Sequence, residues 1–365
     1  MTDELSSARE QIDALDAQIQ ALISQRARIA QTIAHIKQRR GERGDHYRPA
    51  REAEVLRRVI ARNQANGGPL TDEVIARLMR EIMSACLSLE SPLTVAYLGP
   101  EGTYTQAAVL KHFGDSVRAR ANNAIDEIFR EVESGAADYG VVPVENSTGG
   151  VVSHTLDELV HTKLRICGEV MLPVHHHLLS MGTDPGAVRK VYSHPQSFAQ
   201  CRKWLDARMP NAIREAVTSN GQAAMQARQE GEGVAAIASL QAGQLHGLNI
   251  LASNIEDDPN NTTRFLVLGK HDPEATGHDL TSIVLSGHRN QPGSLLRLLQ
   301  PLANAGLDMT RIESRPVKGS AVQDYYFFID FAGHAGTPEA RKALDEVSGL
   351  AAFFKVLGSY PRAVV

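Results

Sequence analysis

The length, composition and charge of the chain narrow its class before any motif is considered. It has 365 residues, of which 42% are hydrophobic, and 38 Lys and Arg against 42 Asp and Glu give a net charge of −4. This composition excludes disordered and fibrous proteins. The nearly balanced charge creates no strong positive electrostatic field that would favour binding to nucleic acid or to an anionic membrane. The 3 cysteines fit neither a disulfide framework nor a zinc motif. Because no signal-peptide pattern and no long apolar run is found, we expect a soluble cytoplasmic protein of two or three domains.

The N-terminal segment carries a heptad pattern. Alternating steps of three and four residues separate its apolar positions, which are Ile12, Leu15, Ile19, Leu22, Ile29, Ile33 and Ile36. A helix over residues 5–38 would be roughly 50 Å long at about 1.5 Å per residue, too long for one small domain to cover, so we expect it to pair with a second chain. Shorter amphipathic helices are predicted over residues 49–65 and 71–90.

Arg26 occupies the position that the heptad pattern leaves open. A guanidinium in an apolar seam needs an anion beside it, because its desolvation costs several kcal/mol. Lys37 lies on nearly the same helix face, Arg51 and Glu52 begin the second helix, and Glu90 is predicted on the apolar face of the third. Two interpretations remain open from these residues: a buried structural ion pair, or a cationic pocket for a dianionic ligand.

The segments AREQIDALDAQIQALISQRARIAQTIAHIK and REAEVL, followed by the third helix, resemble the all-helical chorismate mutase domain over residues 1–91. The resemblance implies that the long helices of two chains cross and that cations clamp the two carboxylates of chorismate. The implied substrate ligands are Arg9, which reaches the partner's site, and Arg26, Lys37, Arg51, Glu52 and Glu90.

The implied reaction is a Claisen rearrangement to prephenate, which needs neither a nucleophile nor a base. The protein holds a compact conformer and stabilises the charge that develops on the breaking ether oxygen, with catalytic residues Lys37 on one side of it and Glu90 on the other. Many members of the family have Gln at the position of Glu90. Because a glutamate donates a hydrogen bond only when protonated, we expect mutase activity to fall as Glu90 ionises.

Three segments of the central region predict a strand, a polar turn and a helix: TVAYLGPEGTYTQAAVLKHF, DYGVVPVENSTGGVVSHTLDEL and KVYSHPQSFAQCRKWL. Hydroxyls and free N–H groups at helix starts bind anions, so three such turns predict a cleft for a small polyanion at the carboxyl ends of strands.

Two other motifs of this region are disfavoured as binding sites. GEGVAA, residues 231–236, follows no strand and is a weak dinucleotide motif. The three histidines 175–177 point in different directions on a strand, which disfavours a metal site.

Together with DDPNNTTRFLVLG, these turns resemble prephenate dehydratase over residues 93–270. The resemblance implies two α/β lobes around a cleft, similar to periplasmic binding proteins, and makes Thr263 the catalytic hydroxyl, with Glu145 and Asn146. Prephenate loses CO₂ and water to give phenylpyruvate, so the enzyme orients the ring and assists the departure of hydroxide. Other implied contacts are Ser193, Gln196 and Gln200, the carboxylate-holding Thr103, Ser147 and Thr148, and Arg264 as support of the Thr263 loop.

Residues 280–361 predict the β-α-β-β-α-β order of a ferredoxin-like sandwich. NQPGSLLRLL and ESRP resemble the motifs of ACT regulatory domains fused to prephenate dehydratases, which implies phenylalanine as effector. A purely structural role in dimerisation stays open. The implied effector-binding residues are Asn290, Gly293, Ser294, Leu295, Leu296, Glu313, Ser314, Arg315 and Pro316.

The sequence therefore predicts a multidomain protein: an all-α mutase domain, a two-lobed α/β dehydratase domain and an α+β ferredoxin-like ACT domain. The resemblances identify a member of the bifunctional chorismate mutase/prephenate dehydratase family, without cofactor or metal and at least a homodimer. A fusion to prephenate dehydrogenase is disfavoured because no strand precedes a G-x-G-x-x-G turn. The alternative from another class is a non-catalytic sensor of aromatic amino acids.

Overall fold

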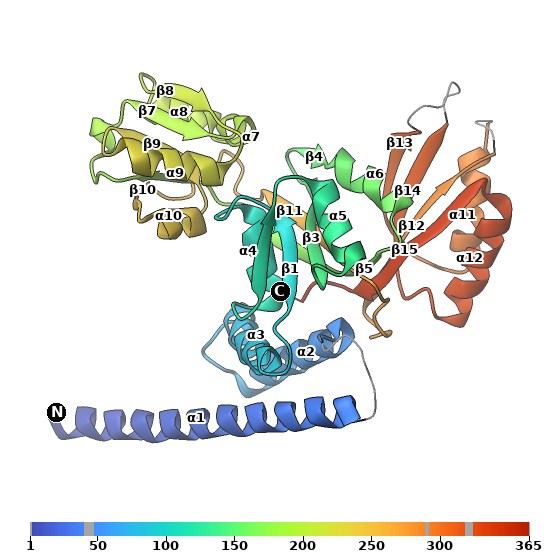
Figure 1. The fold of residues 1–365 in the computed structure, drawn as a ribbon, viewed down its shortest axis with the longest axis horizontal. Helices are drawn as coiled ribbons and strands as arrows, with labels where there is room; N and C mark the ends of the chain where they lie inside the picture. The colour runs from blue at the N-terminus through green and yellow to red at the C-terminus, as the bar shows by residue number, and fades with distance from the viewer. Residues whose placement is uncertain (1, 40–46, 289–291, 318–323, 365) are drawn as a thin grey trace. The chain divides into compact units, whose positions relative to one another are not determined.

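The computed structural model describes residues 2–39, 47–288, 292–317 and 324–364 (Figure 1). The chain divides into two compact units, and each is described by itself. One unit comprises Met1–Arg48, Val55–Leu93 and Phe113–Arg118, and the other comprises Pro49–Glu54, Thr94–His112 and Ala119–Val365. None of the described helices combines the length and the apolar character that a membrane crossing requires.

The N-terminal region is helical, as predicted. Its elements are α1 (Thr2–Arg39), α2 (Pro49–Asn66) and α3 (Asp72–Ser88). The third helix ends two residues before Glu90, which lies in a turn where its N–H donates to Leu87 O at 2.9 Å. The prediction that this helix reaches residue 90 is wrong by two residues, and the helix ends ahead of Pro92, which disfavours helical geometry at Ser91.

The first lobe of the second unit is a mixed sheet with the order β2-β1-β3-β11-β5, and β4 pairs with β3. Its strands are β1 (Thr94–Leu98), β2 (Arg118–Asn122), β3 (Tyr139–Asn146), β4 (Gly150–Val151), β5 (Arg165–Pro173) and β11 (Thr262–Gly269). Its helices are α4 (Tyr104–Phe113), α5 (Ile125–Ser134) and α6 (Ser153–His161). Strand β11 runs antiparallel between β3 and β5, and its register sets Thr263 opposite Asn146.

The second lobe has the sheet order β10-β6-β9-β7-β8. Its strands are β6 (His177–Ser180), β7 (Lys190–Ser193), β8 (Ile213–Ala216), β9 (Val234–Ala238) and β10 (Asn249–Ala252). Its helices are the 3₁₀ turn η1 (Pro185–Ala187), α7 (Pro195–Gln200), α8 (Arg202–Arg208), α9 (Asn220–Glu230) and α10 (Leu240–His246). The chain enters this lobe through residues 174–176 and leaves it through residues 253–261. The predicted pair of α/β lobes is thus confirmed.

The C-terminal region has the predicted β-α-β-β-α-β order. Its elements are β12 (Asp279–Ser286), α11 (Ser294–Asn304), β13 (Met309–Pro316), β14 (Tyr325–Ala332), α12 (Pro338–Leu350) and β15 (Phe353–Pro361). The strands form an antiparallel sheet with the order β13-β14-β12-β15, and both helices cover one face of it (Figure 1). The opposite face shares a hydrophobic core with the first lobe, to which Val284, Phe328 and Tyr360 contribute.

Gly358 allows the closest approach between β15 and the first lobe. A Cβ atom at this position would lie 2.3 Å from Ile166 O and 2.7 Å from Ile166 N. Both neighbours are backbone atoms, so they cannot swing away as the end of a side chain would.

We predict that Gly358→Ala lowers the free energy of unfolding by about 1–3 kcal/mol, the usual cost of overpacking, because β15 must move away from β5. Gly349→Ala is the matched control, since no atom lies within 4 Å of the added Cβ and the residue is inside α12, where alanine is the better helix former. Thermal and urea unfolding of both variants measure the difference. Equal stability of the two variants would contradict the close approach.

Candidate functional site

A cavity of about 330 Å³ lies between the two lobes of the second unit, at the ends of strands from both sheets. Five of the predicted site residues line it: Thr103, Asn146, Gln196, Gln200 and Thr263. Among the described residues of its lining there is no Lys or Arg. An anion in this cavity would therefore be held by N–H, O–H and amide donors and by positive helix ends.

Thr263 and Asn146 form the centre of the polar part of the cavity. The Asn146 Oδ1 atom accepts hydrogen bonds from the N–H groups of Gly149, at 2.8 Å, and Thr148, at 3.2 Å, and these donors fix the orientation of the amide. Asn146 Nδ2 then donates to Thr263 Oγ1 at 2.8 Å. Because the Thr263 oxygen accepts this bond, its own hydrogen is available to donate to another group.

Two glutamines of α7 extend this cluster from the second lobe. Gln200 Nε2 donates to Thr148 Oγ1 at 2.5 Å, and the Thr148 hydroxyl donates to Asn146 Oδ1 at 2.8 Å. Gln196 Nε2 approaches the same Asn146 oxygen at 3.5 Å. Predicted site residues from both lobes therefore meet.

The remaining predicted hydroxyls contact the protein itself. Thr103 Oγ1 donates to Leu98 O at 3.1 Å, and Ser147 Oγ accepts from Thr262 N at 3.0 Å. Ser193 is fully buried, and its Oγ donates to Asn220 Oδ1 at 3.2 Å. Ser147 and Ser193 thus hold the turns that surround the cavity.

Glu145 and Arg264 lie on the other side of their strands. Residues alternate between the two faces of a sheet, so the neighbours of Asn146 and Thr263 point away from the cavity, and neither residue lines it. Glu145 Oε2 accepts from Arg311 Nε of β13 at 2.7 Å. Arg264 donates to Glu169 at 2.9 Å and also reaches the sheet of the C-terminal region.

Arg264 is held there by two groups of the C-terminal sheet. Its Nη1 donates to Asp330 Oδ2 at 2.6 Å, and its Nη2 donates to Tyr360 Oη at 2.9 Å. Burial opposes the charge of this guanidinium, but Tyr360, Asp330 and Glu169 outweigh burial and raise the pKa of Arg264. No local sequence pattern encodes these contacts, because their partners lie far away along the chain.

Three residues that line the cavity or contact the predicted site residues were not predicted from the sequence: Tyr104, His176 and Asn261. Tyr104 and His176 line the cavity, and His176 contacts both Tyr104 and Gln200. Asn261 Oδ1 accepts from Asn146 Nδ2 at 2.9 Å. The sequence features that could have identified two of them are the tyrosine inside GPEGTYT and the asparagine before TTRF.

No group of three His, Cys, Asp or Glu side chains suited to a metal ion occurs within the part of the chain that the structure describes.

The predicted mutase residues fall in both units. Arg9, Arg26, Lys37 and Glu90 belong to the unit that contains α1, whereas Arg51 and Glu52 belong to the other. Arg26 is exposed in the single chain, with Nη1 3.5 Å from Ile82 O, and Arg51 Nη1 pairs with Glu54 Oε2 at 2.9 Å. That these six residues form one site stays a prediction.

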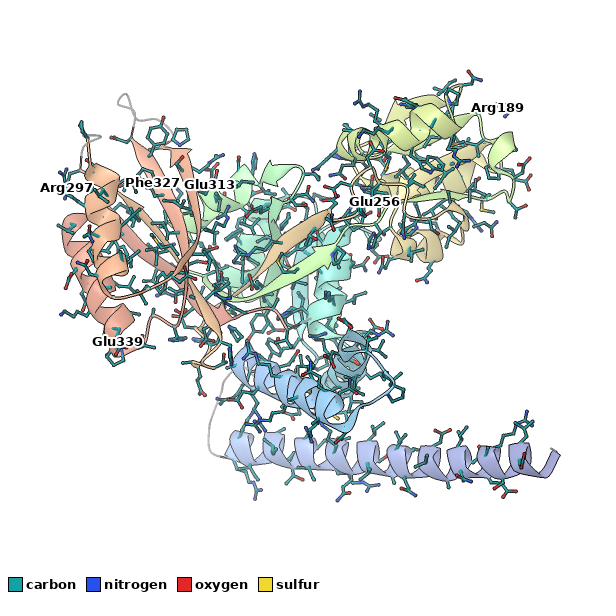
Figure 2. All side chains as sticks on the ribbon, turned by 180° about the vertical axis from the view of Figure 1, so that it is seen from behind. Arg189, Glu256, Arg297, Glu313, Phe327 and Glu339 are labelled. Atoms are coloured by element: carbon teal, nitrogen blue, oxygen red, sulfur yellow. The ribbon has the colours of Figure 1, made fainter. Side chains whose placement is uncertain are left out.

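The predicted effector residues of α11 lie beside a small cavity in the ACT region. Its volume is about 50 Å³, and Ser294 and Leu295 line it together with Phe327 of β14 (Figure 2). Gly293 precedes the helix with a φ of 78°, which favours glycine. Leu296 is 65% exposed, and Asn290 lies outside the described residues.

The ESRP segment forms the end of β13, and none of its residues lines this small cavity. Arg315 instead points to α6 of the first lobe, where it contacts Ser153 and lies 3.1 Å from Asp157 Oδ1. Glu313, Ser314 and Pro316 lie on the same edge strand of the sheet.

Comparison with known proteins identifies each region. The family of type II chorismate mutases matches residues 8–91, the prephenate dehydratase family matches residues 95–273, and the ACT domain family matches residues 281–349. A prephenate dehydratase from Arthrobacter aurescens, solved in complex with L-Phe, is 33% identical and has a TM-score of 0.67, covering 75% of this chain and 93% of that chain.

Two curated relatives match all three regions at once. The bifunctional chorismate mutase/prephenate dehydratase of Stutzerimonas stutzeri is 52% identical over 367 residues, which covers 100% of this chain and 99% of the relative. The protein of the same name from Pseudomonas aeruginosa is 51% identical with the same coverage. Because this similarity extends over the whole chain, the protein belongs to the family of bifunctional chorismate mutase/prephenate dehydratases.

Proposed function

We propose that the chain converts chorismate to prephenate and prephenate to phenylpyruvate in phenylalanine biosynthesis, and that phenylalanine inhibits it. The proposed domains are the mutase over residues 1–91, the dehydratase over 93–270 and the ACT domain over 280–361. The observation that carries the dehydratase is the Thr263 hydroxyl, which accepts from Asn146 at the wall of the cavity between the lobes.

In the dehydratase reaction, the bond from the ring to its carboxylate breaks and CO₂ leaves. The electron pair of that bond enters the ring, and the bond to the ring hydroxyl breaks with departure of hydroxide, which becomes water on taking up a proton. Thr263 donates a hydrogen bond to the departing oxygen, because its own oxygen is already engaged by Asn146. Aromatisation supplies the driving force, so this donor needs only to be well placed.

The carboxylates of prephenate are held without fixed positive side chains. Thr103, Gln196 and Gln200 offer polar groups on the cavity wall, and the N-terminus of α9 lies beside it with Ser219 as its N-cap. Helix N-termini carry partial positive charge and free N–H groups, which suits a carboxylate. Ser147, Thr148 and Ser193 hold the surrounding turns, and Glu145 and Arg264 support β3 and β11 from the opposite face.

For the dehydratase, we predict that Thr263→Ala lowers kcat by about 10²–10³-fold, the usual cost of removing one donor to a developing oxyanion. Chorismate supplied alone would then give prephenate without phenylpyruvate, while mutase activity stays unchanged. Thr262→Ala is the matched control on the adjacent strand position, whose hydroxyl donates to Asn260 O at 3.4 Å. Full dehydratase turnover of Thr263→Ala would remove Thr263 from the mechanism.

For the mutase, Arg9, Arg26, Lys37, Arg51, Glu52 and Glu90 are the proposed ligands of chorismate. The apolar row of α1 supports the pairing of two chains, because Ile12, Leu15, Ile19 and Leu22 are each more than half exposed in the single chain. Burial of these side chains against a second copy would bring Arg9 of that copy to the site. We therefore propose a homodimer or a higher homo-oligomer.

We predict that Glu90→Ala lowers the mutase kcat by about 10²–10³-fold, the usual cost of removing one group that stabilises a developing oxyanion. Glu90→Gln places a side-chain N–H donor at the same position and is expected to recover most of this loss. Glu10→Ala, an exposed position on α1, is the control and is expected to keep the wild-type rate. Wild-type mutase turnover of Glu90→Ala would refute the role of Glu90.

For regulation, the cavity of about 50 Å³ beside α11 is smaller than the roughly 300–1,000 Å³ of typical ligand sites, so we propose that a second ACT domain completes the phenylalanine site. The contacts of Arg264 with Asp330 and of Glu145 with Arg311 link the ACT sheet to the strands of the catalytic cavity. A shift of the ACT sheet would therefore move β3 and β11.

We predict that Asp330→Asn raises the phenylalanine concentration needed for half inhibition of the dehydratase by at least about fivefold, the lower end of typical allosteric coupling. Mutase activity in the same chain serves as an internal control, and Asp345→Asn on the exposed face of α12 is the control variant. Unchanged inhibition would show that the link through Arg264 does not transmit the signal.

The three cysteines are buried and free, which is typical of proteins in a reducing compartment and supports a cytoplasmic location.

A further inference from the structure

His176 lies where the chain passes from the first lobe to the second. Its side chain is 1% exposed and borders the cavity between the lobes. Its backbone N–H donates at 2.8 Å to Glu256, which belongs to the segment that returns to the first lobe (Figure 2). This bond ties the backbone of His176 to the segment through which the chain returns to the first lobe.

Each ring nitrogen of His176 faces a polar side chain. Nδ1 lies 2.9 Å from Tyr104 Oη, and Nε2 lies 2.8 Å from Gln200 Oε1. Since an amide oxygen only accepts, Nε2 must carry a hydrogen. Burial lowers the pKa of His176, which favours the neutral ring, so Nδ1 is left as an acceptor. The Tyr104 hydroxyl has a single hydrogen, which is shared between His176 Nδ1 at 2.9 Å and His175 O at 2.7 Å. Burial also raises the pKa of Tyr104, so this phenol keeps its proton.

The bonds beyond Gln200 run in the same direction. Gln200 donates to Thr148 at 2.5 Å, Thr148 donates to Asn146 at 2.8 Å, and Asn146 donates to Thr263 at 2.8 Å. The Thr148 hydroxyl lies closer to Asn146 Oδ1, at 2.8 Å, than to Asn261 Oδ1, at 3.4 Å. The series ends at the Thr263 hydroxyl, whose oxygen accepts from Asn146. Hydrogen bonds aligned in this way polarise and strengthen one another.

We propose that His176 is a positioning residue of the dehydratase: through its Nε2–H tautomer it orients Gln200, and the series of side chains from Tyr104 to Thr263 keeps the Thr263 hydroxyl pointing as a donor at the leaving oxygen of the substrate. The inference rests on the proposed dehydratase function. It assigns a role to a histidine that touches neither Thr263 nor the reacting atoms.

The first test compares His176→Leu with His176→Gln in the full chain, with prephenate as substrate. His176→Leu removes the donor to Gln200, and we expect kcat to fall by about 10–100-fold with a much smaller change in KM, as for misplacement of a catalytic group. His176→Gln places an amide N–H near the position of Nε2 and is expected to recover most of kcat. His177→Leu, the equally buried neighbour, is the matched control.

The second test is a double-mutant cycle with Thr148→Ala, which breaks the series between Gln200 and Asn146. If His176 acts through this series, His176→Leu costs little further activity in the Thr148→Ala background, because residues of one network are not additive. An equal loss in both backgrounds would show a merely structural role and overturn the proposal. Wild-type kcat in His176→Leu would overturn it as well.

Thermal unfolding of each variant reports whether its lobes are folded. If the wild type produced no phenylpyruvate from prephenate, the proposed function itself would fail. Turnover by the wild type together with unchanged turnover by His176→Leu would refute only the role of His176.

Discussion

A closed ring of buried hydrogen bonds around Arg264 joins the catalytic lobe to the ACT sheet, and both depend on it. Arg264 donates to Asp330 and Tyr360, and Ser282 donates to Asp330 Oδ1 at 2.5 Å. The hydroxyl hydrogen of Ser282 is used there, so Tyr360, whose pKa is raised by burial, donates to Ser282 at 2.7 Å. Loss of Arg264 or Asp330 from such a cluster costs about 3–5 kcal/mol, because the charged partner that remains stays buried.

Because side chains alternate between the two faces of β3 and β11, the contacts of Arg264 lie on the face opposite the proposed site. On β11, Thr263 faces the cavity and Arg264 faces the ACT sheet, and on the paired strand β3, Asn146 and Glu145 divide in the same way. One face of this strand pair therefore carries the proposed chemistry, and the other carries the contacts of the regulatory domain.

The sequence predicted the elements and the motifs better than it predicted which way side chains face. Periodicity located the helices, and the turn motifs placed Asn146, Gln196 and Gln200 beside one cavity, because parallel strands end at one edge of a sheet. Thr263 lies at the start of the antiparallel strand β11 and was predicted only from the resemblance to prephenate dehydratase. The partners of Arg264 lie 66 to 96 residues away along the chain, and no local pattern encodes them. His176 was hidden for the same reason: the three adjacent histidines were considered only as a disfavoured metal site, and only the fold sets one of them between Tyr104 and Gln200.

The hydrogen bond between Gln200 and Thr148 gives the two lobes a part in orienting Thr263. Gln200 comes from the second lobe and Thr148 from the first, so any separation of the lobes breaks this bond before it disturbs the pair formed by Asn146 and Thr263. Thr148 then loses the donor that holds its hydroxyl toward Asn146. In the proposed dehydratase, the full series of hydrogen bonds that ends at Thr263 therefore forms only while α7 of the second lobe contacts the first lobe.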